Sequence, residues 1–312
     1  MRAFKFGGNL KGENKMGTNN ISEEEAKKYI LRYGWQPVVV KGSGKIFDTK
    51  KDDRPLNYFL DDIAKCHQEK LRVAIVHGGG TEINDVLKAN GLPIQFAEDG
   101  SRITDMKTLP YVIESMAEVN QSIVEGLQSR GVNAEPVRGT DVFSVEAKDF
   151  DNLGYVGKLT GFNSTLSSKF RFNALKPEVA FFDKASIVPV VNPVSSDKYG
   201  RVFNINADDA ATELAVARAA RLIMLSDTPV RNNGVVIPEI DVVGMELQKL
   251  IETGVIKDGM LKKIMACADA IERGMKPMSV IDGTKKDSLW NELTTDSGSG
   301  TLIYKGPEKG EY

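Results

Sequence analysis

Two glycine-rich loops follow short apolar runs, and each could handle a phosphate group. Residues 77–80 (His-Gly-Gly-Gly) come after the run 71–76 and just before a helix that is expected to open at Thr81. Their backbone N–H groups could face an anion at a helix N-terminus, or the glycines could serve a tight turn. Residues 41–44 (Lys-Gly-Ser-Gly) follow the run 38–40. The lysine ammonium could face a transferring phosphoryl group, or lie solvated at a turn.

Polar side chains also gather where two helices are expected to begin. Residues 204–209 (Asn-Ile-Asn-Ala-Asp-Asp) precede an alanine-rich stretch, and an N-cap accounts for only one of their four polar side chains. Residues 258–263 (Asp-Gly-Met-Leu-Lys-Lys) open another helix, and we expect its lysines in the first turn. The helix dipole disfavours cations there, so they need an anionic partner such as phosphate, or ample solvent. Arg102 could hold a carboxylate bidentately or form a surface ion pair.

Nucleophiles and metal ligands are scarce in this sequence. The chain has two histidines and two cysteines, which are His67, His77, Cys66 and Cys267. They form no CxxC pair, so neither a zinc site nor a Ser/His/Asp or Cys/His catalytic set is expected. We expect His77 to be structural rather than a catalytic base. Such a sequence favours a reaction that depends on positioning and charge, as phosphoryl transfer does.

The overall composition excludes several classes of partner. The 312 residues include 41 Lys and Arg against 43 Asp and Glu, a formal net charge of -2. Nucleic acid is therefore not an expected partner, because backbone binding normally shows a clustered basic excess. No stretch approaches the ~20 apolar residues of a membrane helix, and no secretory signal is recognisable. We expect a cytoplasmic protein with no membrane partner.

The elements that must position these residues alternate between two periodicities. The β-branched runs 38–40 and 71–76 read as strands, and between them Leu56, Phe59 and Ile63 fall at helical spacing. Strand, helix, strand predicts a βαβ unit and a parallel sheet. The pattern recurs, with helices expected over 81–89, 109–127, 208–220 and 260–273 and strands at 187–191, 221–225, 279–282 and 301–304. A doubly wound αβα sandwich follows.

The first 34 residues read as an arm that precedes the main body. Residues 10–25 are polar and turn-rich, and Ser22 with Glu25 matches a capping box for a helix that Gly34 would end. Within the arm, residues 5–9 (Lys-Phe-Gly-Gly-Asn) nearly duplicate the lysine loop. No convincing apolar strand precedes them, so we interpret them as a coincidental match.

Taken in order, short blocks of this sequence resemble the amino acid kinase family, and within it the kinases that act on N-acetylglutamate. The blocks are VVVKGSG (38–44), VHGGGTEIN (76–84), GSRITD (100–105), VNQSIV (119–124), LGYVGK (153–158), FNINADDAA (203–211), MLSDTPV (224–230), KDGMLKK (257–263) and ELTTDSGSGTLI (292–303). The resemblance covers roughly 36–305, and its specificity lies in the joint order and spacing.

The resemblance implies a three-layer αβα sandwich with a mostly parallel central sheet and two lobes. Residues 35–212 would bind the acylated amino acid and residues 213–312 would bind ATP. The implied reaction moves the γ-phosphoryl group of ATP to the side-chain carboxylate of N-acetylglutamate, in arginine biosynthesis. The matching lysines in similar kinases, here Lys41 and Lys263, stabilise charge on the moving group, and Asp208 would organise them. The glycines that would donate backbone N–H groups are Gly44, Gly79 and Gly80.

The resemblance also assigns the binding of both substrates. Arg102 and Asn204 would hold the α-carboxylate and neighbouring polar atoms of the acyl amino acid. The implied nucleotide pocket comprises Ser226, Asp227, Thr228, Val255, Ile256 and Lys257. Mg²⁺ would arrive on the ATP phosphates, with no dedicated metal site in the protein. A homodimer is expected, extended to a hexamer where the N-terminal helix takes part.

Three positions depart from the family pattern. Ser43 stands where the family usually has a glycine, and it adds a Cβ beside the phosphate path. Thr284 and Asp287 stand where arginine-inhibited members carry Arg and His, so feedback by arginine is left open. Two other functions compete with the expected one. They are a kinase for another acylated amino acid, such as an aminoadipate derivative, and a non-catalytic arginine-sensing module related to acetylglutamate synthase.

Overall fold

The computed structural model describes most of the main body of the chain. The described residues are Ala26, Lys28, Ile30, 36–48, 52–162, 187–226, 230–295 and 298–306. Ala26, Lys28 and Ile30 are helical, within the helix predicted for the arm. The predicted capping box and the lysine loop at residues 5–9 lie outside the described residues.

A central sheet of eight strands organises the molecule. In spatial order the strands are β12 (Glu239–Asp241), β14 (Gly300–Tyr304), β13 (Met278–Asp282), β9 (Arg221–Ser226), β1 (Val38–Gly42), β2 (Val73–His77), β6 (Val188–Asn192) and β3 (Ala134–Arg138). From β13 to β3 all neighbours pair in parallel, whereas β14 runs antiparallel to β13. The strand predicted at 38–40 is therefore the middle of a parallel array, with strands hydrogen-bonded on both sides.

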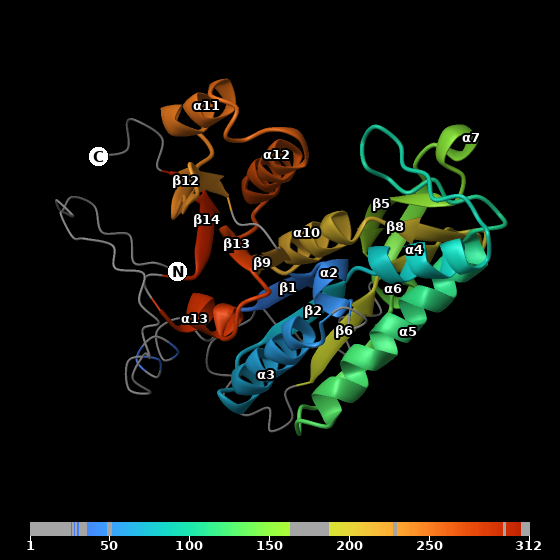
Figure 1. The fold of residues 1–312 in the computed structure, drawn as a ribbon, viewed down its shortest axis with the longest axis horizontal. Helices are drawn as coiled ribbons and strands as arrows, with labels where there is room; N and C mark the ends of the chain where they lie inside the picture. Colours follow the sequence, from blue (N-terminus) through green and yellow to red (C-terminus); the bar gives the residue numbers. More distant parts are fainter. Residues whose placement is uncertain are drawn as a thin grey trace.

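Helices cover both faces of this sheet, which confirms the predicted αβα sandwich (Figure 1). One face carries α3 (Arg54–Gln68), α5 (Leu109–Gln128) and α13 (Ser288–Thr294). The opposite face carries α10 (Ala207–Ala217), α11 (Met245–Glu252) and α12 (Asp258–Glu272). The predicted helix between the first two strands is α3, and β1 and β2 are indeed parallel.

Side chains of β1 alternate between two hydrophobic cores. Val38 and Val40 pack with α3 and α5 on one side, while Val39 joins the core beneath α10 and α12. This alternation follows from the period of two in a strand. Lys41, the next residue after Val40, therefore leaves the sheet on the same face as Val39, towards α10 and α12.

Helix α13 is held in place by two buried charged groups. The Asp62 carboxylate on α3 accepts hydrogen bonds from the N–H groups of Leu289 (3.0 Å) and Trp290 (3.3 Å) at the start of α13. Near its other end, Glu292 pairs with Arg221 of β9, and both side chains are almost fully buried. These contacts tie α13 to α3 and to β9 of the central sheet.

A second sheet, which the sequence analysis did not predict, lies beside the first. Its four strands, in spatial order, are β4 (Phe143–Ala147), β5 (Val156–Phe162), β8 (Val202–Ile205) and β7 (Val194–Ser196). Polar residues and glycines interrupt the apolar pattern of β5 and β8, so no buried run marks them. The remaining elements are α2 (Gly44–Phe47), α4 (Gly80–Ala89), α6 (Gly139–Val142), α7 (Phe150–Leu153), β10 (Arg231–Asn232) and β11 (Val235–Val236).

The predicted division into two lobes stays a prediction. The central sheet takes strands from both sides of the proposed boundary at residue 212, and that boundary falls inside α10. Within the described part of the chain, no helix is both long enough and apolar enough to cross a membrane.

Candidate active site

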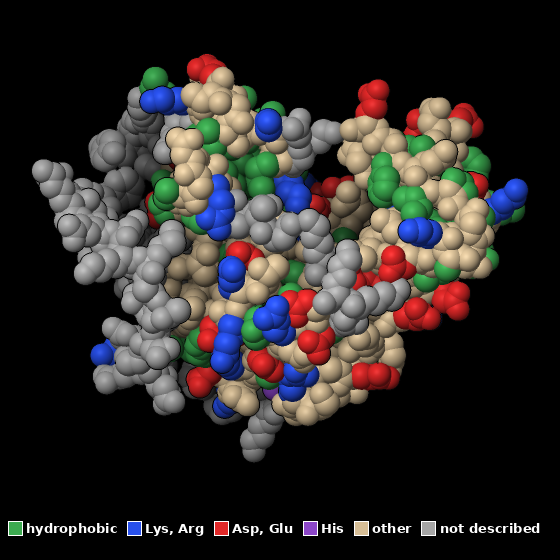
Figure 2. Space-filling view, viewed as in Figure 1, with side chains coloured by type: hydrophobic (Ala, Val, Ile, Leu, Met, Phe, Trp, Pro, Cys, Tyr) green, Lys and Arg blue, Asp and Glu red, His purple; other side chains and the backbone are tan. Residues whose placement is uncertain are grey.

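The carboxyl ends of the parallel strands bring the two glycine-rich loops together. Gly42 lies opposite His77 in the register of β1 and β2, and the N–H of Gly78 donates to the carbonyl oxygen of Gly42 at 3.1 Å. Ligands of open parallel sheets bind at this edge, where the connecting loops start. Figure 2, in the same view as Figure 1, shows the surface indented between the part carrying α11 and α12 and the part carrying α4 and α7.

Lys41 and Lys263 converge on one carboxylate, that of Asp208. The Nζ atom of Lys41 lies 2.7 Å from Asp208 Oδ1, and that of Lys263 lies 3.3 Å from Oδ2. Burial alone would raise the pKa of the Asp208 carboxyl, but the two lysine charges outweigh it and hold that pKa below its usual value. The Asp208 carboxylate is therefore ionised at neutral pH, where it can pair with both lysines.

Each member of this cluster comes from a different element. Lys41 is the fourth residue of β1, and Asp208 lies in the first turn of α10 behind the N-cap Asn206, whose side chain accepts from the N–H of Asp208 at 2.8 Å. The expectation that Lys263 lies in the first turn of its helix is wrong. α12 begins at Asp258, which puts Lys263 in the second turn, where it reaches an anionic partner inside the protein.

Glycines bring backbone N–H groups close to this cluster. A Cβ on Gly44 would lie 3.2 Å from the amide nitrogen of Gly80 and 3.3 Å from that of Thr81. Gly79 is the N-cap of α4 and has no side chain with which to cap it, so the first amides of α4 stay available to an anion. A Cβ on Gly80 would meet nothing within 4 Å, which places this glycine against open space.

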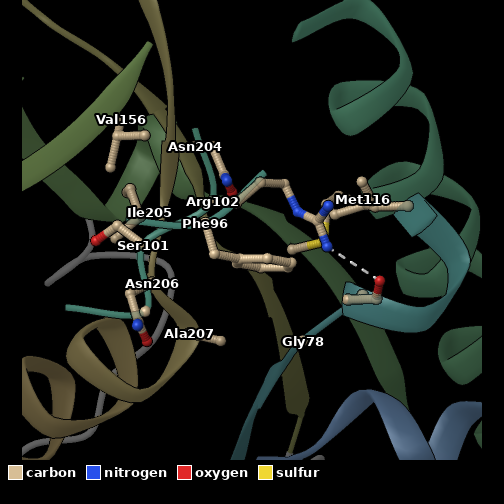
Figure 3. Close-up of a pocket in the computed structure, with 14 residues that line it drawn as sticks. Gly78, Phe96, Ser101, Arg102, Met116, Val156, Asn204, Ile205, Asn206 and Ala207 are labelled. Atoms are coloured by element: carbon tan, nitrogen blue, oxygen red, sulfur yellow. Dashed lines mark hydrogen bonds between the residues drawn. The ribbon is translucent and has the colours of Figure 1, made fainter. Parts of the chain in front are cut away.

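That open space is a pocket of about 170 Å³, and Arg102 lies in its wall (Figure 3). The Nη2 atom of Arg102 donates to the carbonyl oxygen of Gly80 at 3.1 Å, marked by the dashed line, and to Oδ1 of Asn84 at 2.6 Å. The ring of Phe96 lies beneath the guanidinium, 4.7 Å from its central carbon. Arg102 is only 8% exposed, and its buried Nη1 atom has no hydrogen-bond partner among the described residues.

Burial lowers the pKa of the Arg102 guanidinium to about 10, so it is still charged at neutral pH. A buried cation with an unsatisfied N–H group is costly unless a ligand pairs with it. An anion in the pocket would supply that partner. This arrangement suits a carboxylate.

The walls of the pocket come from a short hairpin and from the second sheet. The hairpin spans residues 95–103, with Phe96 and Arg102 paired across it, and Lys148 anchors it through Asp99 (2.7 Å). The lining residues are Gly78, Gly79, Gly80, Ile83, Phe96, Gly100, Ser101, Arg102, Met116, Val156, Asn204, Ile205, Asn206 and Ala207. Arg102, Asn204, Gly79 and Gly80, predicted separately, thus line one pocket, and Asp208 directly follows its last lining residue.

Sequence reasoning missed most of the apolar wall. Ile83 on α4, Met116 on α5, Phe96 on the hairpin and Val156 on β5 were not assigned to a pocket. The hairpin and the second sheet that place Phe96 and Val156 there were themselves not predicted. Asn84 was also missed, although it closes one of the matching blocks. Its position four residues after Gly80 places it on the same face of α4, which was the available signal.

His77 is structural, as predicted. It is fully buried, its Nδ1 atom lies 3.2 Å from the carbonyl oxygen of Gly78, and its Nε2 atom lies 3.0 Å from the amide nitrogen of Asn120. Burial lowers the pKa of His77 to about 4, so the ring is neutral at physiological pH. It supports the turn after β2 rather than a proton transfer.

The residues expected to bind the nucleotide lie at two places near this edge. Ser226 ends β9, next to β1, and Lys257 is the exposed N-cap of α12. Ile256 is fully buried and Val255 is half-buried. Asp227 and Thr228 lie outside the described residues.

The three positions that depart from the family pattern have separate surroundings. The Ser43 hydroxyl has no hydrogen-bond partner among the described residues, although it lies directly before Gly44. Thr284 donates its hydroxyl to Asp282 at 2.6 Å. Asp287 precedes α13 with a positive φ of 59° and pairs with Lys65. Thr284 and Asp287 thus make local contacts around the end of β13 and the start of α13.

The donor set of the site suits phosphate rather than a bound metal. Lysine ammonium groups and backbone amides are partners of anions. Among the residues that the structure describes, no group of three or more His, Cys, Asp or Glu side chains could hold a metal ion.

Comparison with known proteins agrees with this chemistry. The chain is 33% identical over 285 residues to the acetylglutamate kinase of Pelagibacter ubique, covering 90% of this chain and 92% of the relative. It is 31% identical to the chloroplastic acetylglutamate kinase of Arabidopsis thaliana, covering 89% of this chain and 78% of that protein.

Solved structures show the same fold. The structure of smu.665 from Streptococcus mutans matches with a TM-score of 0.67 and 27% identity, over 87% of this chain and all (100%) of that one. The N-acetylglutamate synthase of Neisseria gonorrhoeae, at 22% identity, shares the fold with a TM-score of 0.74, over 91% of this chain and 63% of the synthase. The pattern that describes the amino acid kinase family matches residues 36–282, and the chain belongs to that family.

Proposed function

We propose that the protein transfers the γ-phosphoryl group of ATP to the side-chain carboxylate of N-acetyl-L-glutamate, which yields an acyl phosphate for arginine biosynthesis. One observation carries the proposal: the Lys41–Asp208–Lys263 cluster forms at the start of α10, and Asp208 directly follows Asn206 and Ala207, which line the pocket together with Gly79, Gly80 and the buried cation Arg102. The names of the relatives from bacteria and plants support the same acceptor.

The chemistry needs cations more than it needs a base. A carboxylate that approaches the γ-phosphate sets two anions against each other, and at about 4 Å this repulsion is worth about 4 kcal/mol at an effective dielectric near 20. The carboxylate oxygen bonds to the γ-phosphorus while the bond from that phosphorus to the bridging oxygen breaks, and ADP leaves. No proton moves, because the glutamate side chain is already ionised at pH 7.

Each cationic group of the site has a place in this reaction. Lys41 and Lys263 offset the negative charge on the oxygens of the transferred phosphoryl group. Asp208 pairs with both ammonium groups and so holds them close to each other. Gly44, Gly79 and Gly80 leave the amides at the start of α4 free to donate to the same oxygens. Water would be excluded by the apolar part of the pocket wall.

Arg102 and Asn204 would hold the amino acid end of the acceptor. The Nη1 group of Arg102 offers the N–H donors that the α-carboxylate would accept, and Asn204 of β8, which lines the same pocket, offers an amide for the neighbouring polar atoms. ATP would lie towards Ser226 and the segment 255–257. Mg²⁺ bound to its phosphates would neutralise part of their charge.

The two competing functions make different predictions. A kinase for an aminoadipate derivative would need a longer pocket. The ratio of kcat/KM for N-acetylglutamate to kcat/KM for the aminoadipate derivative tells which acid the protein prefers. A non-catalytic arginine sensor would not need two lysines converging on one aspartate beside glycines. The assembled cluster therefore favours the enzyme.

The decisive experiment measures ADP release with purified protein, MgATP and each acid in turn, with and without L-arginine. We expect turnover with N-acetylglutamate, and a kcat/KM at least tenfold lower with N-acetyl-aminoadipate. Arg102→Ala should raise KM for the acid and leave KM for ATP unchanged. No acid-dependent ADP release from the folded protein, or an effect of Arg102→Ala confined to ATP, contradicts the proposal.

Assembly and location belong to the same proposal. We expect a cytoplasmic homodimer, extended to a hexamer if the helix of the arm pairs between subunits. Deleting residues 1–34 should reduce the mass measured by light scattering and leave kcat unchanged. Loss of phosphoryl transfer in the folded, truncated protein would show that the lysine loop at residues 5–9 takes part.

A further inference from the structure

The guanidinium of Arg102 is held through one of its two terminal nitrogens. The Nη2 atom donates to Gly80 at 3.1 Å and to Asn84 Oδ1 at 2.6 Å, while the ring of Phe96 supports the flat face. The Nη1 atom is buried and without a partner in the described part of the chain. The protein thus binds the Nη2 group of Arg102 and leaves the Nη1 group to donate to a ligand.

Asn84 makes the shorter of the two contacts that fix this orientation. It lies one turn after Gly80 in α4, so its side chain and the Gly80 carbonyl meet Nη2 from the same face of the helix. Its orientation is unambiguous, because a guanidinium has only donors and must face the amide oxygen. We infer that Asn84 is a positioning residue, which aims Nη1 of Arg102 at the acid without neutralising the arginine charge.

The choice of an amide matters because aspartate would have the same shape. A carboxylate at 2.6 Å from Nη2 would form a full ion pair with Arg102 and would repel an incoming carboxylate. The amide oxygen accepts the same hydrogen bond and leaves the positive charge to the substrate. The inference rests on the proposed function, because it takes the ligand of Arg102 to be a carboxylate.

A purely structural role for Asn84 predicts a different order of effects. If Asn84 only joined the hairpin of residues 95–103 to α4, the isosteric Asn84→Asp would be milder than Asn84→Ala, because the contact with Arg102 would survive. If Asn84 positions a charge, Asn84→Asp is the more damaging change for binding an anion. The two variants therefore separate the two roles.

The test compares KM for N-acetylglutamate, KM for ATP and kcat in both variants. We expect Asn84→Ala to raise KM for the acid about tenfold, as loss of a hydrogen bond to a charged group does. Asn84→Asp should raise it about a hundredfold. In both, KM for ATP should stay within about twofold of the native value. Asn90→Asp, the same change at the exposed C-cap that follows α4, is the control and should leave all three constants unchanged.

An Asn84→Asp variant that binds the acid as well as Asn84→Ala, or better, overturns the inference, and so does a native KM in both. Thermal melts exclude misfolding, and Asn84→Ser replaces Asn84→Ala if the alanine variant melts early. A second readout does not depend on the substrate. In ¹⁵N NMR of the free protein, the Nη signals of Arg102, assigned with Arg102→Lys, should be separate in the native chain and averaged by rotation in Asn84→Ala.

The two readouts distinguish the failure of each proposal. If the native protein does not turn over N-acetylglutamate, the proposed function fails, and the NMR comparison alone decides whether Asn84 orients Arg102. If turnover is present but the Arg102 signals are identical in both proteins, the positioning role of Asn84 fails and the proposed function stands.

Discussion

Asp208→Asn is the most informative single change, because it removes the charge that two lysines share and keeps the shape of the side chain. At the observed separations of 2.7 and 3.3 Å, each attraction amounts to about 5–6 kcal/mol at an effective dielectric near 20. Desolvation cancels much of this, and removing one partner of a buried pair costs about 3–5 kcal/mol. Lys263 is 32% exposed, which favours the lower end of that range.

We expect this loss mainly in the transition state. Released from Asp208, the two ammonium groups repel each other and no longer face the moving oxygens together. A loss of about 3–4 kcal/mol corresponds to a fall in kcat of about 10²–10³. The site also gains one positive charge, so KM for ATP should not rise.

Steady-state ADP release with varied ATP measures both constants, and circular dichroism checks the fold. Asp209→Asn, at the exposed neighbouring position, is the matched control and should retain native kcat. A kcat within threefold of native in folded Asp208→Asn would refute the reasoning. A raised KM for ATP with native kcat would instead assign Asp208 to nucleotide binding.

Three further changes test the site and its supports. Gly44→Ala should lower kcat about tenfold or more with an unchanged melting temperature, because its Cβ would cover amides 3.2 and 3.3 Å away. Glu292→Gln should lower the free energy of unfolding by about 3–5 kcal/mol in urea titrations, because it leaves Arg221 buried without its counter-charge. Burial raises the pKa of the Asp62 carboxyl to about 6. Between about pH 4 and 6 the folded protein therefore binds more protons than the unfolded chain, and the free energy of unfolding falls as the pH rises through that window. Asp62→Asn lacks this titration, so its free energy of unfolding minus that of the native chain should increase by about 2–3 kcal/mol from pH 4 to pH 7. Urea titrations at each pH measure both free energies, and a difference that does not change with pH would contradict this.

The sequence predicts best where one periodicity dominates. Uninterrupted β-branched runs gave β1 and β2, and the spacing of Leu56, Phe59 and Ile63 gave α3, because burial on one or both faces enforces these patterns. The second sheet was missed for the same physical reason. Strand β8 is four residues long with Asn204 among them, so its pattern is too short and too polar to separate from a loop.

Distances between remote residues could not be predicted from the sequence. It places Lys41 at a strand end and Lys263 near a helix start, but their meeting at Asp208 depends on how α10 and α12 pack over the sheet. The prediction that Lys263 lies in the first turn of α12 was wrong because the position of the helix start was misjudged by part of a turn. In the second turn, Lys263 lies away from the helix N-terminus and pairs with the Asp208 carboxylate. Arg102, predicted as a carboxylate ligand, lies in the wall of the pocket, whereas the hairpin that buries it was not predicted.

The central position of β1 couples the chemistry to the last stages of folding. Lys41 is placed only when β1 pairs both with β2, which is near in sequence, and with β9, which is far away. Contacts between segments that are distant in sequence form slowly, because the chain loses the entropy of closing a long loop before these contacts stabilise it. On dilution from denaturant, catalytic turnover should therefore return after most of the helical signal, and a partly folded chain in which β9 is still detached should be inert.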